Sequence, residues 1–185
     1  MSHWCGCSLI KRSRRPESRS PSPRALDKEG RERRADLEKV RTLAKDLTKA
    51  YPRSPREMLG GYVIGARCAD KCRALLLGIN GEYNYWPCSL AGLLFAFTGI
   101  TPDQIKEIVA TGATDEELGA WINVHSKVQD RQAVIEWNNK MRDLRLSEMA
   151  PAVQAYMEDY IPKYVPTHRP VYTYFDVYDL EEKRV

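Results

Sequence analysis

Four charged side chains stand within an otherwise apolar segment of this 185-residue chain, and a polar turn follows them. The charged residues are Arg67, Asp70, Lys71 and Arg73, and the turn contributes Glu82, Tyr83 and Tyr85. An unpaired ion in a protein core costs several kcal/mol. Charges among apolar residues must therefore be paired within the protein or held for a ligand.

Two interpretations of this cluster are open. In the first, Asp70 is locked by Arg67 or Arg73, and the ion pair fixes helix packing. In the second, the excess of three cations over one carboxylate binds an anionic ligand, and the three turn residues close the site. The spacing does not decide between them, because it does not tell which side chains point inward.

The leading functional hypothesis is a non-catalytic module that binds a small anionic ligand or a protein partner beside these seven residues. The alternative is a small enzyme in which Asp70 or Glu82 is the acid–base group and the arginines or lysine hold an anion. Whether a reaction is catalysed, the identity of the ligand and the oligomeric state are left open.

The residues around the cluster predict a helix over 55–77. Ser54-Pro55-Arg56-Glu57 supplies a serine cap, a proline at the first helical position and a glutamate three residues after the cap, and Gly78 is a typical stop. Asp70 then falls in the middle of an apolar stripe. The opposite face carries four small residues, Gly61, Gly65, Cys68 and Cys72. These predict a close helix neighbour, and hence a central helix.

Apolar periodicity and caps predict further helices along the chain. Their expected ranges are 29–50, 89–97, 102–111, 115–125, 130–144 and 151–160. A turn or short hairpin is expected over 79–87, with Asn80-Gly81 as a type I′ pair. The aromatic end, 171–178, is expected to be a strand or an extended strap. The sequence thus predicts an all-α fold of six or seven helices, packed as one compact domain over 30–182.

The positive charge of the chain is concentrated at its N-terminus. Residues 1–34 hold ten of the 29 lysines and arginines but only four of the 25 acidic residues, a net charge of +6, whereas residues 35–185 carry −2. Residues 1–28 are rich in Arg, Ser and Pro without apolar periodicity, so we expect a disordered basic tail. The nearly neutral body gives no indication of nucleic-acid binding, and no apolar run is long enough to predict a membrane helix.

Five cysteines, an odd number, indicate a reducing compartment, and we expect a cytoplasmic protein. Cys68 and Cys72 are four residues apart, but small buried thiols are the expected outcome rather than a metal site. Cys88 as a nucleophile needs a base, for which His125 and His168 are candidates by residue type only. No common nucleotide-binding or hydrolase signature occurs, and we expect no cofactor and no metal.

Several motifs between Pro52 and Gly99 occur in the order of a known family. PRSPREMLGGYV, ADKCRALLLG, NGEYNYWPC and FTGI resemble the bacterial family of domain of unknown function number 5069, and weaker similarity through TDEELGAWI extends the resemblance to about residues 45–145. That family usually has a histidine where this chain has Asn84, and an acidic residue near Ser89-Leu90-Ala91. These differences weigh against acid–base catalysis, and the resemblance implies no activity.

Overall fold

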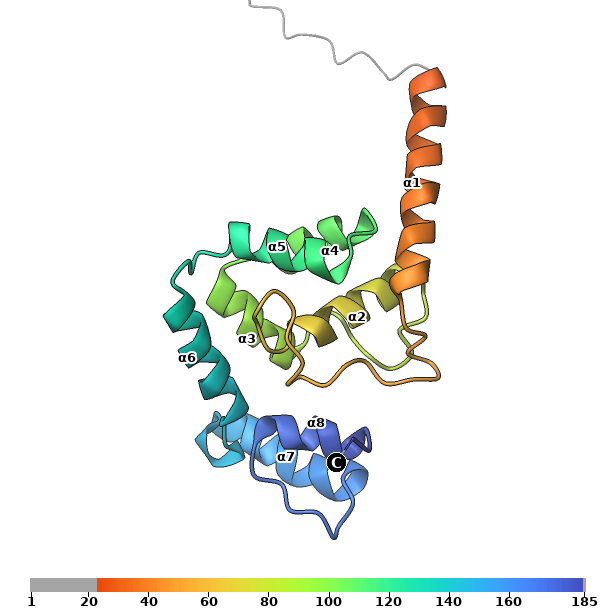
Figure 1. The fold of residues 1–185 in the computed structure, drawn as a ribbon. Helices are drawn as coiled ribbons and strands as arrows, with labels where there is room; N and C mark the ends of the chain where they lie inside the picture. The colour runs from red at the N-terminus through yellow and green to blue at the C-terminus, as the bar shows by residue number, and fades with distance from the viewer. Residues whose placement is uncertain (1–22, 185) are drawn as a thin grey trace, which may run out of the picture.

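A computed structural model describes residues 23–184, which form α-helices joined by loops, with no strand in that range (Figure 1). The eight α-helices and one short 3₁₀ helix of this range are Pro23–Leu43 (α1), Gly65–Leu76 (α2), Ser89–Thr98 (α3), Pro102–Ala110 (α4), Asp115–His125 (α5), Arg131–Arg142 (α6), Leu146–Glu148 (η1), Pro151–Tyr164 (α7) and Tyr174–Glu181 (α8). The predicted all-α class is confirmed. No helix in the described range is long and apolar enough to cross a membrane.

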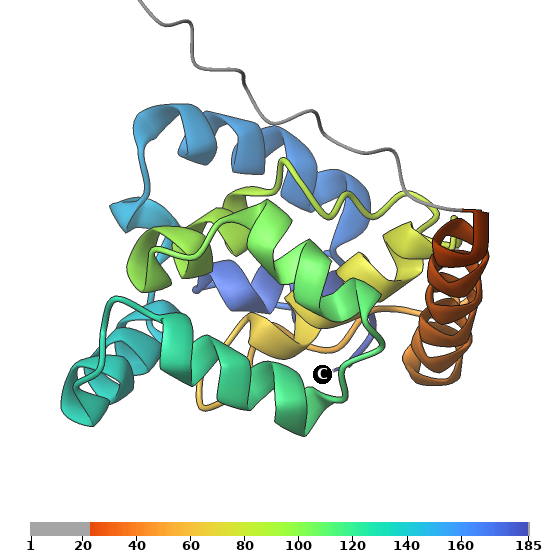
Figure 2. The same ribbon diagram turned by 90° about the horizontal axis from the view of Figure 1, so that it is seen from above.

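Helix α2 is the centre of the molecule. Its residues from Gly65 to Ala74 are all buried, including the four charged ones, and it contacts α1, α3 and α4. In Figure 1, α4 and α5 lie on one side of α2, and α7 and α8 lie on the other. Viewed from above, α1 stands at one edge and α7 runs along another (Figure 2). The prediction of a central helix is confirmed.

The prediction that this helix starts at residue 55 is wrong by ten residues. The Ser54 cap forms a turn, in which the Arg56 amide donates to Ser54 Oγ at 3.1 Å and the Ser54 amide donates to Glu57 Oε1 at 3.1 Å. The helix does not propagate from it, because Gly60 and Gly61 adopt positive φ of 62° and 92°. A cap alone does not form a helix when two glycines of low helix propensity come after it.

The small-residue column is therefore not one helix face. Gly61 lies outside α2, and a Cβ at that position would meet nothing within 4 Å. The close backbone approach occurs instead at Gly60, where a Cβ would lie 2.8 Å from the Cα of Gly119 in α5. A loop glycine and a helix glycine thus bring the 55–64 loop against α5.

Helix α1 begins and ends earlier than its predicted range of 29–50. It starts at Pro23, inside the segment expected to be disordered, and it ends at Leu43. Residues 1–22, the rest of the expected tail, lie outside the described residues.

The aromatic C-terminus is a helix, so the prediction of a strand or strap is wrong. Thr173 and Asp176 form a capping box, in which the Asp176 amide donates to Thr173 Oγ1 at 3.3 Å and the Thr173 amide donates to Asp176 Oδ2 at 2.8 Å. This Thr-x-x-Asp signal opens α8, although aromatic and β-branched residues favour strands. Tyr174 and Phe175 pack into the core.

The 79–87 segment is a turn and not a hairpin. The Tyr83 amide donates to the Asn80 carbonyl at 3.0 Å, and Gly81 has φ of 55°. A type I′ pair needs positive φ at two residues, and Asn80 does not have it, so that detail of the prediction is wrong.

The predicted helix starts at Ser89, Pro102 and Asp115 are confirmed, the last two with complete capping boxes at Thr101 and Thr114.

Candidate functional site: a closed arginine clasp beside a tyrosine-lined cleft

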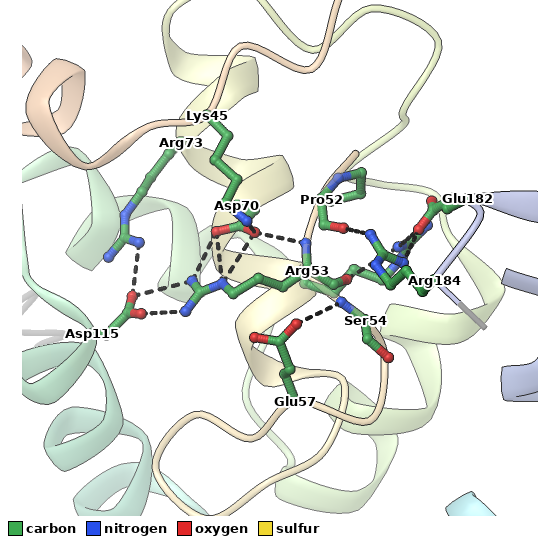
Figure 3. Close-up of polar contacts among 11 residues, drawn as sticks. Lys45, Pro52, Arg53, Ser54, Glu57, Asp70, Arg73, Asp115, Glu182 and Arg184 are labelled. Carbon is green, nitrogen blue, oxygen red and sulfur yellow. Dashed lines mark hydrogen bonds and ion pairs between the residues drawn. The ribbon is translucent and has the colours of Figure 1, made fainter. Parts of the chain in front are cut away.

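The Asp70 carboxylate is held by Arg53, which lies in the irregular segment between α1 and α2. The Arg53 amide donates to Oδ2 at 2.8 Å, and its guanidinium donates to Oδ1 at 2.8 Å through Nη2 and at 3.1 Å through Nε (Figure 3). Lys45 Nζ lies 3.7 Å from Oδ2. With both oxygens accepting from Arg53 and only 2% of its side chain exposed, Asp70 offers no free oxygen to a ligand.

Arg53 also pairs with Asp115, the first residue of α5, and Asp115 pairs with Arg73. We call this network of Lys45, Arg53, Asp70, Arg73 and Asp115 the clasp. Both oxygens of Asp115 accept from the Arg53 guanidinium, and Arg73 Nη1 donates to Oδ1 at 2.7 Å (Figure 3). Arg73 Nη2 donates to the Ala113 carbonyl at 3.0 Å, which leaves Arg73 Nε as the buried side-chain atom without a hydrogen-bond partner among residues 23–184. Burial raises the pKa of Asp115, but the hydrogen bonds from Arg53 and Arg73 outweigh it and hold the pKa below its usual value.

Arg67 belongs to a second buried network, at the C-terminal end of the chain. Its guanidinium donates to Glu182 at 2.8 Å and 2.6 Å, and only 4% of its side chain is exposed. Arg184 also contacts Glu182 and donates to the Pro52 carbonyl. The end of the chain is thereby tied to α2 and to the segment that carries Arg53.

Asp70 is thus paired within the protein, as one of the two interpretations required, but with neither of the predicted partners. Arg67 pairs with Glu182 and Arg73 with Asp115, while Asp70 pairs with Arg53. Tyr85 is also buried, and its hydroxyl donates to the Pro102 carbonyl at 2.7 Å.

The other four predicted residues line one cleft of about 470 Å³. They are Arg67, Lys71, Glu82 and Tyr83. The opposite wall comes from α7 and α8 and is formed mainly by aromatic side chains; its members are Tyr156, Tyr160, Tyr164, Tyr178 and Glu181. Cys88, Ser89 and Leu90 close the cleft at the start of α3.

Lys71 is the unusual cation of this cleft. It is 7% exposed, and its Nζ lies 3.2 Å from the Cys88 sulfur. No carboxylate in residues 23–184 makes an ion pair with it, in contrast to Arg53, Arg67 and Arg73. A buried ammonium without a carboxylate partner attracts a negatively charged group of a ligand.

Three tyrosines of the cleft have a pKa above the ordinary value of a phenol. Burial raises the pKa of Tyr83, Tyr160 and Tyr178, and the negative charge of Glu182 or Glu181 adds to the rise for Tyr83 and Tyr160. The Arg67 guanidinium lies over two of the rings, 5.7 Å from the Tyr83 centroid and 5.0 Å from the Tyr178 centroid. These stacked contacts orient the rings, so the cleft presents fixed aromatic faces.

Among residues 23–184, the remaining thiols and imidazoles do not form a site. Cys68 and Cys72 are buried and unpaired, and burial raises the pKa of both thiols, that of Cys72 to about 12. His125 stacks on Trp121 in α5, and neither it nor His168 lines the cleft. Within the described range, no group of three or more His, Cys, Asp or Glu residues is arranged to hold a metal ion.

A family model described as a domain of unknown function (DUF5069) matches residues 49–184. The chain belongs to the DUF5069 family. The match begins at residue 49, inside the 45–145 segment that carries the resemblance, and continues past residue 145 to include α7, α8 and Arg184. Apart from Lys45, every residue of the clasp and of the cleft therefore lies inside the DUF5069 match. No curated protein matches the chain.

The sequence did not predict several residues of these sites. They are Arg53 and Asp115 of the clasp, Glu182 of the Arg67 network, and the three tyrosines of α7 in the cleft. Tyr156, Tyr160 and Tyr164 are spaced by four, which places them on one helix face, and this spacing is a signal that the sequence carries. Arg53 and Glu182 are 129 positions apart along the printed sequence and stand in segments without periodicity, so no local pattern points to either.

Proposed function

We propose that the protein is a binding module whose tyrosine-lined cleft takes a small, flat ligand with one negative charge. The observation that carries this proposal is the Lys71 ammonium, buried in the cleft wall and without a carboxylate partner among the described residues. An anionic group of the ligand would accept hydrogen bonds from the N–H groups of Lys71 that do not contact the Cys88 sulfur, and such charge-assisted hydrogen bonds are the strong ones.

The other charges of the cleft limit the ligand to a single negative charge. Arg67 is already neutralised by Glu182, so it adds little attraction for an anion. Glu82 and Glu181 lie on the walls, and Tyr160 donates to Glu181 at 2.8 Å. A second negative charge on the ligand would face these carboxylates and be repelled.

The aromatic walls favour a flat ligand body. Tyr160 lies between two ring neighbours, with centroids 5.4 Å from Tyr156 and 4.4 Å from Tyr164. Tyr156 and Tyr164 are about half exposed, which leaves ring faces available for stacking. A cleft of about 470 Å³ is in the size range of small-molecule sites, so a compact aromatic or conjugated acid fits the proposal.

A cytoplasmic location is part of the proposal. Three cysteines of the described range are free, and a reducing compartment keeps free thiols stable.

The test compares benzoate with benzamide, which has the same ring without the charge. Binding is measured by calorimetry and thermal shift on the full chain, with Lys71→Met as the variant and Lys140→Met, an exposed lysine of α6, as its matched control. Benzoate is expected to bind and to stabilise the wild type and Lys140→Met, with an affinity lower by about tenfold or more for Lys71→Met. Equal affinity of the two lysine variants, or of benzoate and benzamide, would overturn the proposal.

A further inference from the structure

Cys88 occupies a position that favours reaction with a ligand. It is the residue that precedes the first turn of α3, it is partly exposed, and it lines the same cleft as the tyrosines. Its sulfur lies 3.2 Å from Lys71 Nζ, so the nearest charge is a buried cation. The two other free thiols of the described range, Cys68 and Cys72, lie inside the core and outside this cleft.

We propose that Cys88 is a nucleophilic thiolate that captures a soft carbon electrophile bound in the cleft, of the class of flat carbonyl compounds with a conjugated carbon–carbon double bond. The inference rests on the proposed function for the position of the ligand, and it names the reactive part of that ligand. A thiolate is a soft nucleophile, and a conjugated carbonyl is both soft and flat, which suits the tyrosine faces.

The addition needs two groups, and the cleft holds both. The thiolate sulfur forms a bond to the β-carbon, and the electron pair of the double bond moves to the α-carbon. That carbon then takes a proton from the Lys71 ammonium, and the neutral amine regains a proton from water. No leaving group departs, and an ammonium has three N–H donors, so Lys71 can contact the sulfur and a ligand oxygen together.

The electrostatics of the sulfur agree with this role. Burial raises the pKa of Cys88, but the Lys71 charge and the amides of Ala91 and Leu90 outweigh it, and the pKa lies below that of an ordinary thiol. At Cys72 burial outweighs the hydrogen bond from Tyr85 and the charges of Lys106 and Arg73, and it raises the pKa to about 12. The same chain thus contains a reactive thiol and unreactive internal controls.

The first test is alkylation of the folded chain by iodoacetamide, in which the sulfur displaces iodide. Cys5 and Cys7, outside the described residues, are changed to Ser in every variant, and peptide mapping follows the three remaining thiols. Cys88 is expected to react faster than Cys68 and Cys72, and faster than the same cysteine in the urea-unfolded chain. Lys71→Met is expected to slow it about tenfold, and Lys140→Met to leave it unchanged. A Cys88 rate no faster than in the unfolded chain, or unaffected by Lys71→Met, would overturn the inference.

The second test uses monomethyl fumarate, a flat conjugated compound with one negative charge. The expected product is the whole reagent added to Cys88, absent from Cys88→Ser and slowed by benzoate. If iodoacetamide labels Cys88 but monomethyl fumarate does not add, the proposed electrophile class is wrong. Rapid labelling of Cys88 without benzoate binding would count against the proposed function alone, whereas benzoate binding with a slow Cys88 would count against this inference alone.

Discussion

Arg53 holds Asp70 with its backbone amide and with its side chain at once, at 2.8 Å in each case. The loop that carries Arg53 is thereby fixed to the central helix, and the same guanidinium reaches Asp115 at the start of α5. Arg53 therefore connects three segments, and the Asp70 carboxylate of α2 stabilises packing and is not free to contact a ligand.

Replacing Asp70 with Asn leaves Arg53 facing Asp115 alone and leaves the buried amide only partly hydrogen-bonded. Removing one partner of a buried ion pair is costly, so we expect a loss of about 3 kcal/mol in the free energy of unfolding. Urea denaturation measures this loss. The matched control is Glu38→Gln, which removes an exposed pair with Arg41 and should leave the unfolding midpoint unchanged. Similar midpoints for the two variants would show that the clasp is not structural.

The pH dependence of stability should report Asp115. Because the arginines hold the pKa of Asp115 below its unfolded value, the folded chain binds fewer protons there than the unfolded chain. The stabilisation is complete above the unfolded pKa of about 4 and is lost as the pH falls through the lower, folded pKa. Urea midpoints across this range should fall less steeply for Asp115→Asn than for the wild type. Asp46 and Asp176, whose pKa values are also lowered, would contribute to the slope that remains.

Alanine substitutions at Gly60 and at Gly61 distinguish the cost of steric crowding from the cost of backbone strain. Both have positive φ, so alanine at either position costs about 1–2 kcal/mol. At Gly60 the new Cβ would also lie 2.8 Å from backbone atoms of Gly119, whereas at Gly61 it meets nothing within 4 Å. We expect Gly60→Ala to be the more destabilising by about 1–3 kcal/mol in urea denaturation. Equal losses would mean that the loop moves away from α5 at little cost.

The helix starts could be predicted from the sequence where the capping residues and the residues after them both favour a helix. The starts of α4 and α5 can be located from the boxes at Thr101 and Thr114, because the residues after each cap propagate a helix. The same signal at Ser54 forms only a turn, because Gly60 and Gly61 interrupt the chain six residues later. Local rules thus locate caps, while propagation depends on the helix propensity of the residues beyond them.

The candidate site could be predicted only in part. Arg67, Lys71, Glu82 and Tyr83 were predicted because α2 and the turn after it are adjacent in sequence, and they do share a cleft. The partners that pair with these charges lie outside α2 and the turn: Arg53, which pairs with Asp70, is in the loop before α2, and Glu182, which pairs with Arg67, is 115 residues away. Helix periodicity says which face a charge occupies but not which loop covers it.

Whether Lys71 receives the anionic group of a flat ligand can be seen directly by crystallography. Crystals soaked in 4-bromobenzoate reveal the ligand through the anomalous signal of bromine, without assumptions about its pose. We expect bromine among the rings of Tyr156, Tyr160 and Tyr164, with the carboxylate at hydrogen-bond distance, about 2.8 Å, from Lys71 Nζ. Bromine found only outside the cleft, or a carboxylate in the cleft that does not contact Lys71, would contradict the proposal.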